Sequence, residues 1–587
     1  MEGSKTTRNV QPAIPTWSRR KSLANAEKVL RLVLPAQDEV RWTEAPLLTL
    51  HHKRRSDAKG EDGVSNTQGR LKRLEFLVQQ VTERLDTVER KNETEPLLQH
   101  EEANAIVKPL KITRSKDDKN SPKSMVLPPL EQVLPIVQLY LQDFNSVLPL
   151  FHADTLLRLV HDCYSVGPQQ RDPVVWAAIN VVLALARRHN FVAIHEVPSS
   201  AACLSRAESV LSKVVLGDIQ LLNIQVLVGM VMLLQTSEDL KPALVLIATT
   251  IRLSHAIGLH DSTYSAHLDS LHVRQRACVF WLAYILDKDL SMRSKQPSIQ
   301  IDDDINLDLP SAIVLQYNED RSKINNTDDD VGVIATADRT VKMNYLTARV
   351  QLAAVEGGVY DYIYSTRSRK RSPEERSHAL QSVVCALEQW KASIPSEFNA
   401  SAGSRRVAPG MLPFLGALHS ASLACTTLIN QAHAWDVEWI ASIRRYGRQG
   451  IEPLLPPKWG VLVGEARDLL ILFGALGQTD RWDFWTTACS YMTAMVLLTA
   501  NSLHKPNHNE LFLDSHLVEA GLQTIGIMVK ETENEKLQSF QATCIELHQR
   551  AQQRCAEAAI MANSVDRSPC FVDIQHGVEG NSHHDNF

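Results

Sequence analysis

Closely spaced cysteine pairs are missing from this sequence of 587 residues. The nine cysteines are scattered, the closest two (Cys544 and Cys555) lie eleven positions apart, and none precedes Cys163. Without a CxxC motif, the spacing indicates no zinc ribbon, zinc finger or redox pair. An odd, scattered set is typical of reduced thiols in an intracellular protein and not of a disulfide framework.

The usual catalytic and nucleotide-binding motifs are missing as well. No GxxxxGK[ST], no GxGxxG after a strand and no GxSxG occurs, so phosphate-binding loops and hydrolase nucleophiles lack support. A net charge of −5 is small for this length, so any contact with nucleic acid must be local. We expect no enzyme activity, no metal and no cofactor.

Membrane and secretory signals also lack support. No apolar core follows the first charged residues, so no secretory signal is expected. Two long uncharged runs, Ile219–Ser237 and Phe484–His504, contain several amide or hydroxyl side chains, and we interpret them as buried helices of a soluble protein with no membrane partner.

Apolar residues at three- and four-residue steps dominate the chain, whereas alternating strand patterns are scarce. The expected fold is therefore all-α, with one large helical region over 131–562. In front of it we expect a flexible basic arm (1–68), a short coiled-coil helix (69–92) and a linker (93–130); a frayed tail follows (563–587). The helices predicted with most support are Pro173–Arg187, Ala202–Leu216, Ile219–Leu234, Pro242–Ile257 and, after a polar loop over Asn318–Asp338, one from about Val341.

The predicted coiled-coil helix has six apolar residues in heptad positions a and d. Opposite charges at g (Arg84) and the following e (Glu89) favour a parallel dimer. The alternative is an amphipathic helix that packs on its own domain, because fewer than three heptads are marginal alone. The heptad residues are Leu71, Leu74, Val78, Val81, Leu85 and Val88.

Basic clusters lie in the arm before this helix and at the start of the helix itself. Clusters of this kind occur in nuclear-import signals and in patches that contact DNA phosphates, and they are also often merely solvated. The candidates are Lys53, Arg54, Arg55, Arg70, Lys72 and Arg73.

The stretch Leu271–Pro310 combines an aromatic-rich helix, an exit and an acidic turn. Arg276 and Asp287 lie eleven positions apart on that helix, which is about 16 Å along its axis, so they cannot pair with each other. If the helix is buried, each charge needs a partner on another helix or at a helix end.

This stretch resembles the middle homology region of the fungal binuclear zinc-cluster transcription regulators. The resemblance lies in Arg274, Arg276, Phe280, Trp281, Asp287, Lys288, Ser291, Pro297, Asp304, Ile305, Leu309 and Pro310, and upstream in Ala248, Arg252, Gly258, Leu259 and His260. The family often has Gly-Arg before the proline, where this chain has Lys295 and Gln296. Pro242 suits the first turn of the upstream helix and Gly258 a left-handed cap at its end. Arg252 is the expected partner of Asp287.

The resemblance implies a nuclear regulator of RNA polymerase II transcription that acts on DNA, with a metabolic gene cluster among the expected targets. It also implies a homodimer or heterodimer through the heptad helix and a helical domain that answers to a small-molecule effector or a partner. The family's zinc cluster should precede the heptad helix, yet no cysteine is found there. Either this member lacks the module, or residues encoded upstream are missing.

Two alternatives remain open at this point. One is a regulator without its own DNA binding that acts as a heterodimer partner or corepressor. The other is an all-helical, metal-dependent enzyme of the terpenoid synthase type, suggested by Asp302, Asp303 and Asp304, although Asn306 stands where that motif needs another aspartate. An acidic turn that caps a following helix would explain the same residues.

Overall fold

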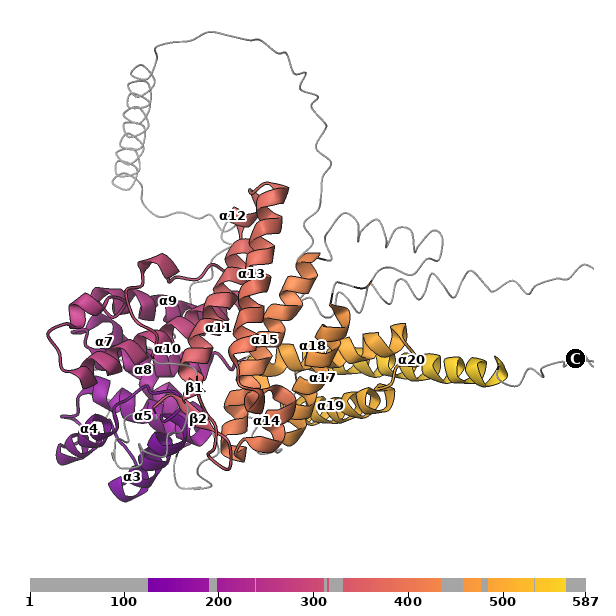
Figure 1. Cartoon of the computed structure of the whole chain (residues 1–587). Helices are drawn as coiled ribbons and strands as arrows, with labels where there is room; N and C mark the ends of the chain where they lie inside the picture. The colour runs from indigo at the N-terminus through magenta and orange to yellow at the C-terminus, as the bar shows by residue number, and fades with distance from the viewer. Residues whose placement is uncertain are drawn as a thin grey trace, which may run out of the picture. The chain divides into compact units, whose positions relative to one another are not determined.

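The structure is a computed structural model, and it describes residues 125–188, 198–237, 239–310, 314–315, 331–433, 455, 458–476, 484–532 and 534–565. Within these ranges the fold is helical apart from one small sheet, as the apolar periodicity predicts. Figure 1 shows the helices in chain order, from α3 in indigo to α20 in yellow. They pack around a large hydrophobic core and a second core formed by the C-terminal helices.

The first part of the large core is built by eight helices, two of which, Pro173–Arg188 and Leu221–Leu234, are buried over most of their length. Eleven consecutive residues of α8, from Asn223 to Leu233, are buried, which explains why this run resembles a membrane span in composition. The helices are α3 (Leu130–Leu139), α4 (Ala153–Ser165), α5 (Pro173–Arg188), α6 (Ser200–Ser209), α7 (Leu211–Leu216), α8 (Leu221–Leu234), α9 (Lys241–Ala256) and α10 (Ser270–Ser294). The predicted helix over 202–216 is in fact two, α6 and α7, which meet at Val210.

The end of α9 confirms the predicted cap. Gly258 has φ +67°, its N–H donates to the carbonyl of His255, and the N–H of Leu259 donates to the carbonyl of Ser254. These two bonds define a Schellman motif, in which glycine supplies the left-handed residue and the next side chain folds back. Leu259 is buried accordingly. Pro242 lies in the first turn of α9, as expected.

In a three-stranded antiparallel sheet of order β1-β3-β2, the strand β2 lies in the segment predicted as a polar loop, β3 lies at the predicted start of a helix, and β1 precedes both. Its strands are β1 (Val314–Leu315), β2 (Val333–Ala335) and β3 (Lys342–Asn344). Met343 of β3 is fully buried and pairs with Val314 and Ile334 on either side. The helix expected from Val341 therefore begins only at Tyr345, after β3, where the Asn344 side chain accepts a hydrogen bond from the N–H of Thr347.

Helices α11 (Tyr345–Val359), α13 (Pro373–Ser393) and α15 (Leu412–His433) complete the large core, with the shorter α12 (Thr366–Arg369) and α14 (Ala400–Arg406) between them. The indole Nε1 of Trp390 donates to the carbonyl of Ala348 at 2.8 Å and joins α13 to α11. By length and composition, the stretch Pro409–Asn430 is apolar enough to cross a membrane, but 61% of its apolar window lies buried inside the structure.

The C-terminal helices surround the second core. They are α17 (Trp459–Ala475), α18 (Phe484–His504), α19 (Leu511–Thr532) and α20 (Glu535–Val565). Helix α15 contributes to both cores, since Leu418 belongs to the large one and Leu423 to the second. A buried carboxylate, Asp514 of α19, pairs with Arg467 of α17 at 2.5 Å and ties these two helices together.

Candidate functional site

The exit of α10 is held by the buried carboxylate of Asp287. Its oxygens accept the N–H of Ile299 at 3.0 and 3.1 Å and the N–H of Gln300 at 2.9 Å. Burial raises the pKa of Asp287, while these backbone bonds oppose the rise. The predicted ion pair with Arg252 is wrong, because Arg252 is exposed on α9 and Asp287 uses main-chain donors twelve and thirteen positions ahead.

Lys288, the next residue, holds the same loop from its acceptor side. Its ammonium donates to the carbonyl of Gln300 at 2.8 Å and to the hydroxyl of Ser298 at 3.1 Å, and it pairs with Asp302 at 2.8 Å. The lysine side chain is only 2% exposed, so these three oxygens replace its hydration. The sequence Asp-Lys therefore binds both the donors and the acceptors of one loop.

The acidic turn is a short 3-10 helix, Asp302–Asp304, and it does not cap a following helix as expected. The next described element after it is the strand β1. Asp302 instead pairs with Lys288 and accepts a hydrogen bond from the Tyr284 hydroxyl at 3.0 Å. Among the described residues, no group of three or more histidine, cysteine or acidic side chains is placed to hold a metal ion.

Arg276 and Trp281 anchor the rest of α10. Arg276 donates through Nη2 to the carbonyl of Ile257 at 2.7 Å and through Nε to the hydroxyl of Ser265 at 2.8 Å. This confirms that the charge finds its partner at a helix end, since Ile257 terminates α9. Trp281 donates from its indole to the carbonyl of Asp308 at 3.1 Å.

The turn after α10 keeps a left-handed residue where the family often has glycine. Lys295 has φ 56° and ψ 36° and ends the helix, so a residue with a side chain adopts the conformation that glycine reaches without strain. Pro297 is exposed two positions later and restricts the loop. His260, the last residue of the upstream signature, has a buried Nδ1 without a hydrogen-bond partner in the described part of the chain, and burial lowers its pKa.

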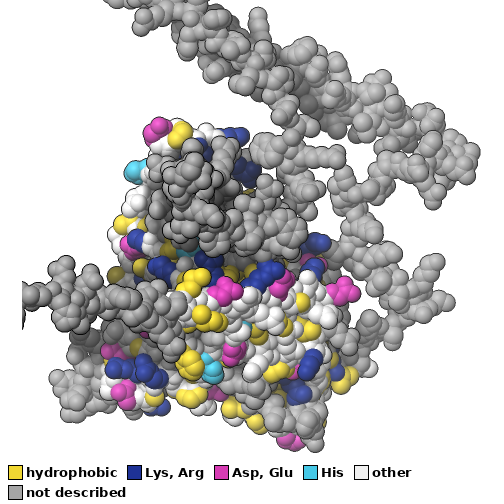
Figure 2. All heavy atoms as spheres, turned by 90° about the vertical axis from the view of Figure 1, so that its right-hand side faces the viewer, with side chains coloured by type: hydrophobic (Ala, Val, Ile, Leu, Met, Phe, Trp, Pro, Cys, Tyr) yellow, Lys and Arg dark blue, Asp and Glu magenta, His cyan; other side chains and the backbone are white. Residues whose placement is uncertain are grey.

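The residues predicted to contact DNA or to dimerise all lie outside the described ranges. These are Lys53, Arg54, Arg55, Arg70, Lys72 and Arg73, and the heptad residues Leu71, Leu74, Val78, Val81, Leu85 and Val88. Figure 2 shows basic and acidic side chains interspersed with apolar ones on the visible described surface. Charge does not mark a nucleic-acid interface on that face.

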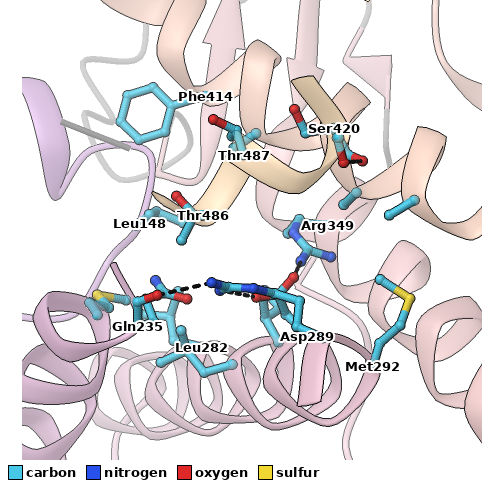
Figure 3. A pocket seen from close by; sticks show the side chains of 18 of the residues that line it. Leu148, Gln235, Leu282, Asp289, Met292, Arg349, Phe414, Ser420, Thr486 and Thr487 are labelled. Atoms are coloured by element: carbon cyan, nitrogen blue, oxygen red, sulfur yellow. Dashed lines mark hydrogen bonds and ion pairs between the residues drawn. The ribbon is translucent and has the colours of Figure 1, made fainter. Parts of the chain in front are cut away.

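A cavity of about 140 Å³ lies where the large core meets the start of α18 (Figure 3). One side is formed by α10, with Leu282, Ile285 and Met292, and by Arg349 of α11. Other lining residues come from α15 and α18, including Phe414, Ser420, Thr486 and Thr487. The walls are largely apolar, and the charged groups are few.

Three of the four charged residues that line this cavity belong to one cluster, which also includes Glu356. Asp289 pairs with Arg293 at 3.2 Å and with Arg349 at 3.7 Å, and Arg349 pairs with Glu356 at 3.0 Å. Glu356 is fully buried, and burial raises its pKa to about 7 against the opposing effect of Arg349. Arg293 also donates to the carbonyl of Gln235 at the end of α8. The cluster thereby connects α8, α10 and α11.

Sequence reasoning missed this cluster entirely. Its only local signals are charges on otherwise apolar helices, namely Asp289 and Arg293 four positions apart on α10 and Arg349 and Glu356 seven apart on α11. Such spacing is also common on solvated helix faces. Their burial, which depends on the helices packed against them, is what distinguishes them.

Comparison with known proteins identifies a family domain within this chain. Residues 137–392 match the model of the fungal specific transcription factor domain. These residues of the chain therefore form a fungal specific transcription factor domain. The match runs from α3 to the end of α13 and includes Asp287, Lys288 and the Asp289–Arg349 cluster, so the family domain contains one wall of the cavity. The other wall, from α15 and α18, lies beyond the matched residues.

Several curated fungal proteins are similar to this chain over more residues than the domain match covers. The chain is 31% identical to an "ABC-transporter-regulating transcription factor" of Aspergillus oryzae over 73% of this chain and 47% of that protein, and 31% identical to one of Aspergillus fumigatus over 71% and 46%. It is 21% identical to the fusaridione A cluster transcription factor of Fusarium heterosporum over 69% and 74%. The chain thus spans about half the length of the first two relatives. No solved structure matches it.

Proposed function

We propose that this protein is a nuclear regulator of RNA polymerase II transcription whose helical domain controls its activity. The observation that carries the proposal is the family match over 137–392, together with relatives that are all named as transcription factors or transcriptional regulators. The geometry is consistent with a control module. The charged side chains of Asp287 and Lys288 hold helix α10 and the following loop together, and a small cavity with charged groups is lined by residues of several helices.

For targets, we propose genes of ABC transporters first and a metabolic gene cluster second. The order follows the relatives, because the proteins named for ABC-transporter regulation are 31% identical to this chain and the one named for a metabolite cluster is 21% identical. Both target classes are read from the names of other proteins and are therefore hypotheses for this one.

For the route to DNA, we propose a dimer through the heptad residues from Leu71 to Val88. The a and d spacing supports association with a second helix, and this also favours the second candidate function, a regulator that reaches DNA through a heterodimer partner. The basic clusters would then neutralise phosphates without reading bases.

The test is chromatin immunoprecipitation of the tagged full chain with transcript profiling of a deletion strain. We expect occupied promoters to coincide with changed transcripts. A Leu74→Asp change at a core heptad position should reduce occupancy several-fold, whereas Gln79→Asp at an outer position should not. Unchanged transcripts and no promoter occupancy would refute the proposal. Occupancy that depends on a second protein, with no binding by the purified chain, would select the heterodimer candidate.

A further inference from the structure

The hydroxyl of Ser420 on α15 is buried without a hydrogen-bond partner among the described residues. The residue is 3% exposed and lines the cavity where α15 and α18 meet (Figure 3). Of the hydroxyl groups on the described lining residues, that of Ser420 alone is left in this state. A buried hydroxyl without a partner costs free energy and calls for an explanation, and a molecule held in the cavity would supply the missing bond.

The charged residues that line the cavity are already engaged within the protein. Arg293 and Arg349 both pair with Asp289, and Arg349 pairs with a second carboxylate on its own helix. Arg188 donates to the carbonyl of Leu233 at 2.9 Å. An ionised ligand would therefore lose its hydration without gaining a counter-charge, which is costly in a buried space. The lining thus favours a neutral ligand.

The size and the remaining walls of the cavity set the body of the ligand. A volume of about 140 Å³ is close to that of an engineered apolar cavity of about 150 Å³ that binds benzene. Leu282 and Ile285 of α10 and Phe414 of α15 offer apolar contacts. The ligand should therefore have an apolar body of about one aromatic ring or a short branched chain.

We propose that this cavity binds a small neutral molecule with an apolar body and one hydrogen-bonding oxygen, such as an alcohol or a ketone, and that this oxygen pairs with Ser420 Oγ. The inference rests on the proposed function, because it names the effector class of the regulatory domain. The ligand would contact α10 and α11 of the family domain and also α18, whose later residues, such as Met495, build the second core. Binding would therefore connect the family domain to the C-terminal helices.

Calorimetry on the purified full chain at pH 7 tests the ligand class with benzyl alcohol, benzoate and benzylamine as probes. These three share one ring and differ in the charge of the polar group. We expect benzyl alcohol to bind about tenfold or more tightly than either charged probe, because no lining charge is left to pair with them. Equal or tighter binding of benzoate or benzylamine would overturn the proposal, as would no detectable binding of benzyl alcohol and of a short branched alcohol, 3-methylbutanol.

Toluene, which lacks the oxygen, isolates the hydrogen bond to Ser420. Ser420→Ala should weaken the binding of benzyl alcohol about tenfold, because the buried oxygen of the ligand loses its partner, and it should leave the binding of toluene unchanged. An unchanged affinity of this variant for benzyl alcohol, or an equal loss for toluene, would refute the role of the hydroxyl.

Two further variants of α15 test the location. Thr427→Val is the matched control, since it also removes a buried hydroxyl without a described partner from α15, but Thr427 does not line the cavity. It should leave the affinity for benzyl alcohol unchanged. Ala421→Leu adds bulk to the cavity wall and should abolish the binding of both probes, which gives a second measurement if Ser420→Ala does not fold. Wild-type affinity in Ala421→Leu, or a loss in Thr427→Val equal to that in Ser420→Ala, would refute this location.

The failure of this inference and that of the proposed function are distinguishable. Binding is measured without DNA or transcription, so unchanged transcripts in a deletion strain would refute the regulatory function while the binding site stands. Conversely, if promoters are occupied and regulated but neither benzyl alcohol nor 3-methylbutanol binds, only the ligand inference is refuted.

Discussion

Replacing Asp287 with alanine removes the acceptor that holds the exit of α10. Two backbone N–H groups lose a charged partner, and that of Gln300 belongs to a fully buried residue. A hydrogen bond to a charged group contributes roughly 1.5–3 kcal/mol, and a buried donor left unpaired costs about 1–3 kcal/mol. Ile299 is 42% exposed, so we assign the larger cost to the N–H of Gln300. We therefore expect Asp287→Ala to lower the free energy of unfolding by about 3 kcal/mol.

The measurement is urea unfolding of the full chain, followed by far-UV circular dichroism at pH 7. Asp287→Asn should cost about 2 kcal/mol, because the amide retains one acceptor oxygen and sets its NH₂ against a donor. Two exposed charges serve as controls. Arg252→Ala and Asp303→Ala should each change the unfolding free energy by under about 0.5 kcal/mol.

The same experiment separates this geometry from an ion pair between α9 and α10. A pair of Arg252 with Asp287 would make both alanine variants costly and would give a double-mutant coupling energy of about 1 kcal/mol or more. The structure predicts a coupling energy near zero. Two results would show that Asp287 does not stabilise the protein through the loop contact. One is an equal loss of unfolding free energy in Arg252→Ala and Asp287→Ala, and the other is a loss below about 1 kcal/mol in Asp287→Ala.

Three further predictions concern charge, backbone and the basic arm. Burial raises the pKa of Glu356 from 4.5 to about 7, so the stability that its neutral form contributes is complete below about pH 4.5 and is lost as pH rises through 7. Relative to Glu356→Gln, the free energy of unfolding of the wild type should fall by up to about 3 kcal/mol between about pH 4.5 and 7.5. Parallel pH profiles of the two proteins in urea denaturation would contradict this. Gly258→Ala should destabilise the protein by about 2 kcal/mol, since a Cβ would lie 2.3 Å from Tyr264. Lys295→Gly should stabilise it by roughly 0.5–1 kcal/mol, because glycine adopts the left-handed conformation without strain. Changes of the same sign in the calorimetric melting temperatures of the two variants would refute the left-handed assignments. In fluorescence anisotropy with a duplex, alanine at Lys53, Arg54 and Arg55 should reduce the slope of log K against log salt by about 2 to 3, and binding insensitive to salt would exclude phosphate contacts.

Local features of the fold were predictable because their causes lie within a few residues. The cap at Gly258 needs only the end of an apolar period, a glycine and a following leucine, and its bonds span five positions. The need of Arg276 for a partner on another helix or at a helix end followed from burying a charge on an aromatic helix. The family resemblance was confirmed for the same reason, since the α10 pattern is contiguous in sequence.

The sequence misled where a short pattern has a distant partner. Lys342–Asn344 is too short to show alternation, and it forms a strand because segments before and after it supply hydrogen-bond partners. The sequence led us to expect a cationic partner for Asp287, because charged residues can be recognised from the sequence alone. Main-chain N–H groups occur at nearly every residue and leave no such signal.

By itself, the sequence determined an all-helical domain, the cap at Gly258 and the resemblance to a known family domain, because hydrophobic periodicity, turn chemistry and contiguous motifs are local properties. Only the tertiary structure decided the cavity. Its lining runs from Phe144 to Ser490, and it exists only once six α-helices (α5, α8, α10, α11, α15 and α18) pack together. Charged and hydroxyl side chains that would be ordinary on a surface here line a cavity because they are buried, and burial depends on how the whole chain packs.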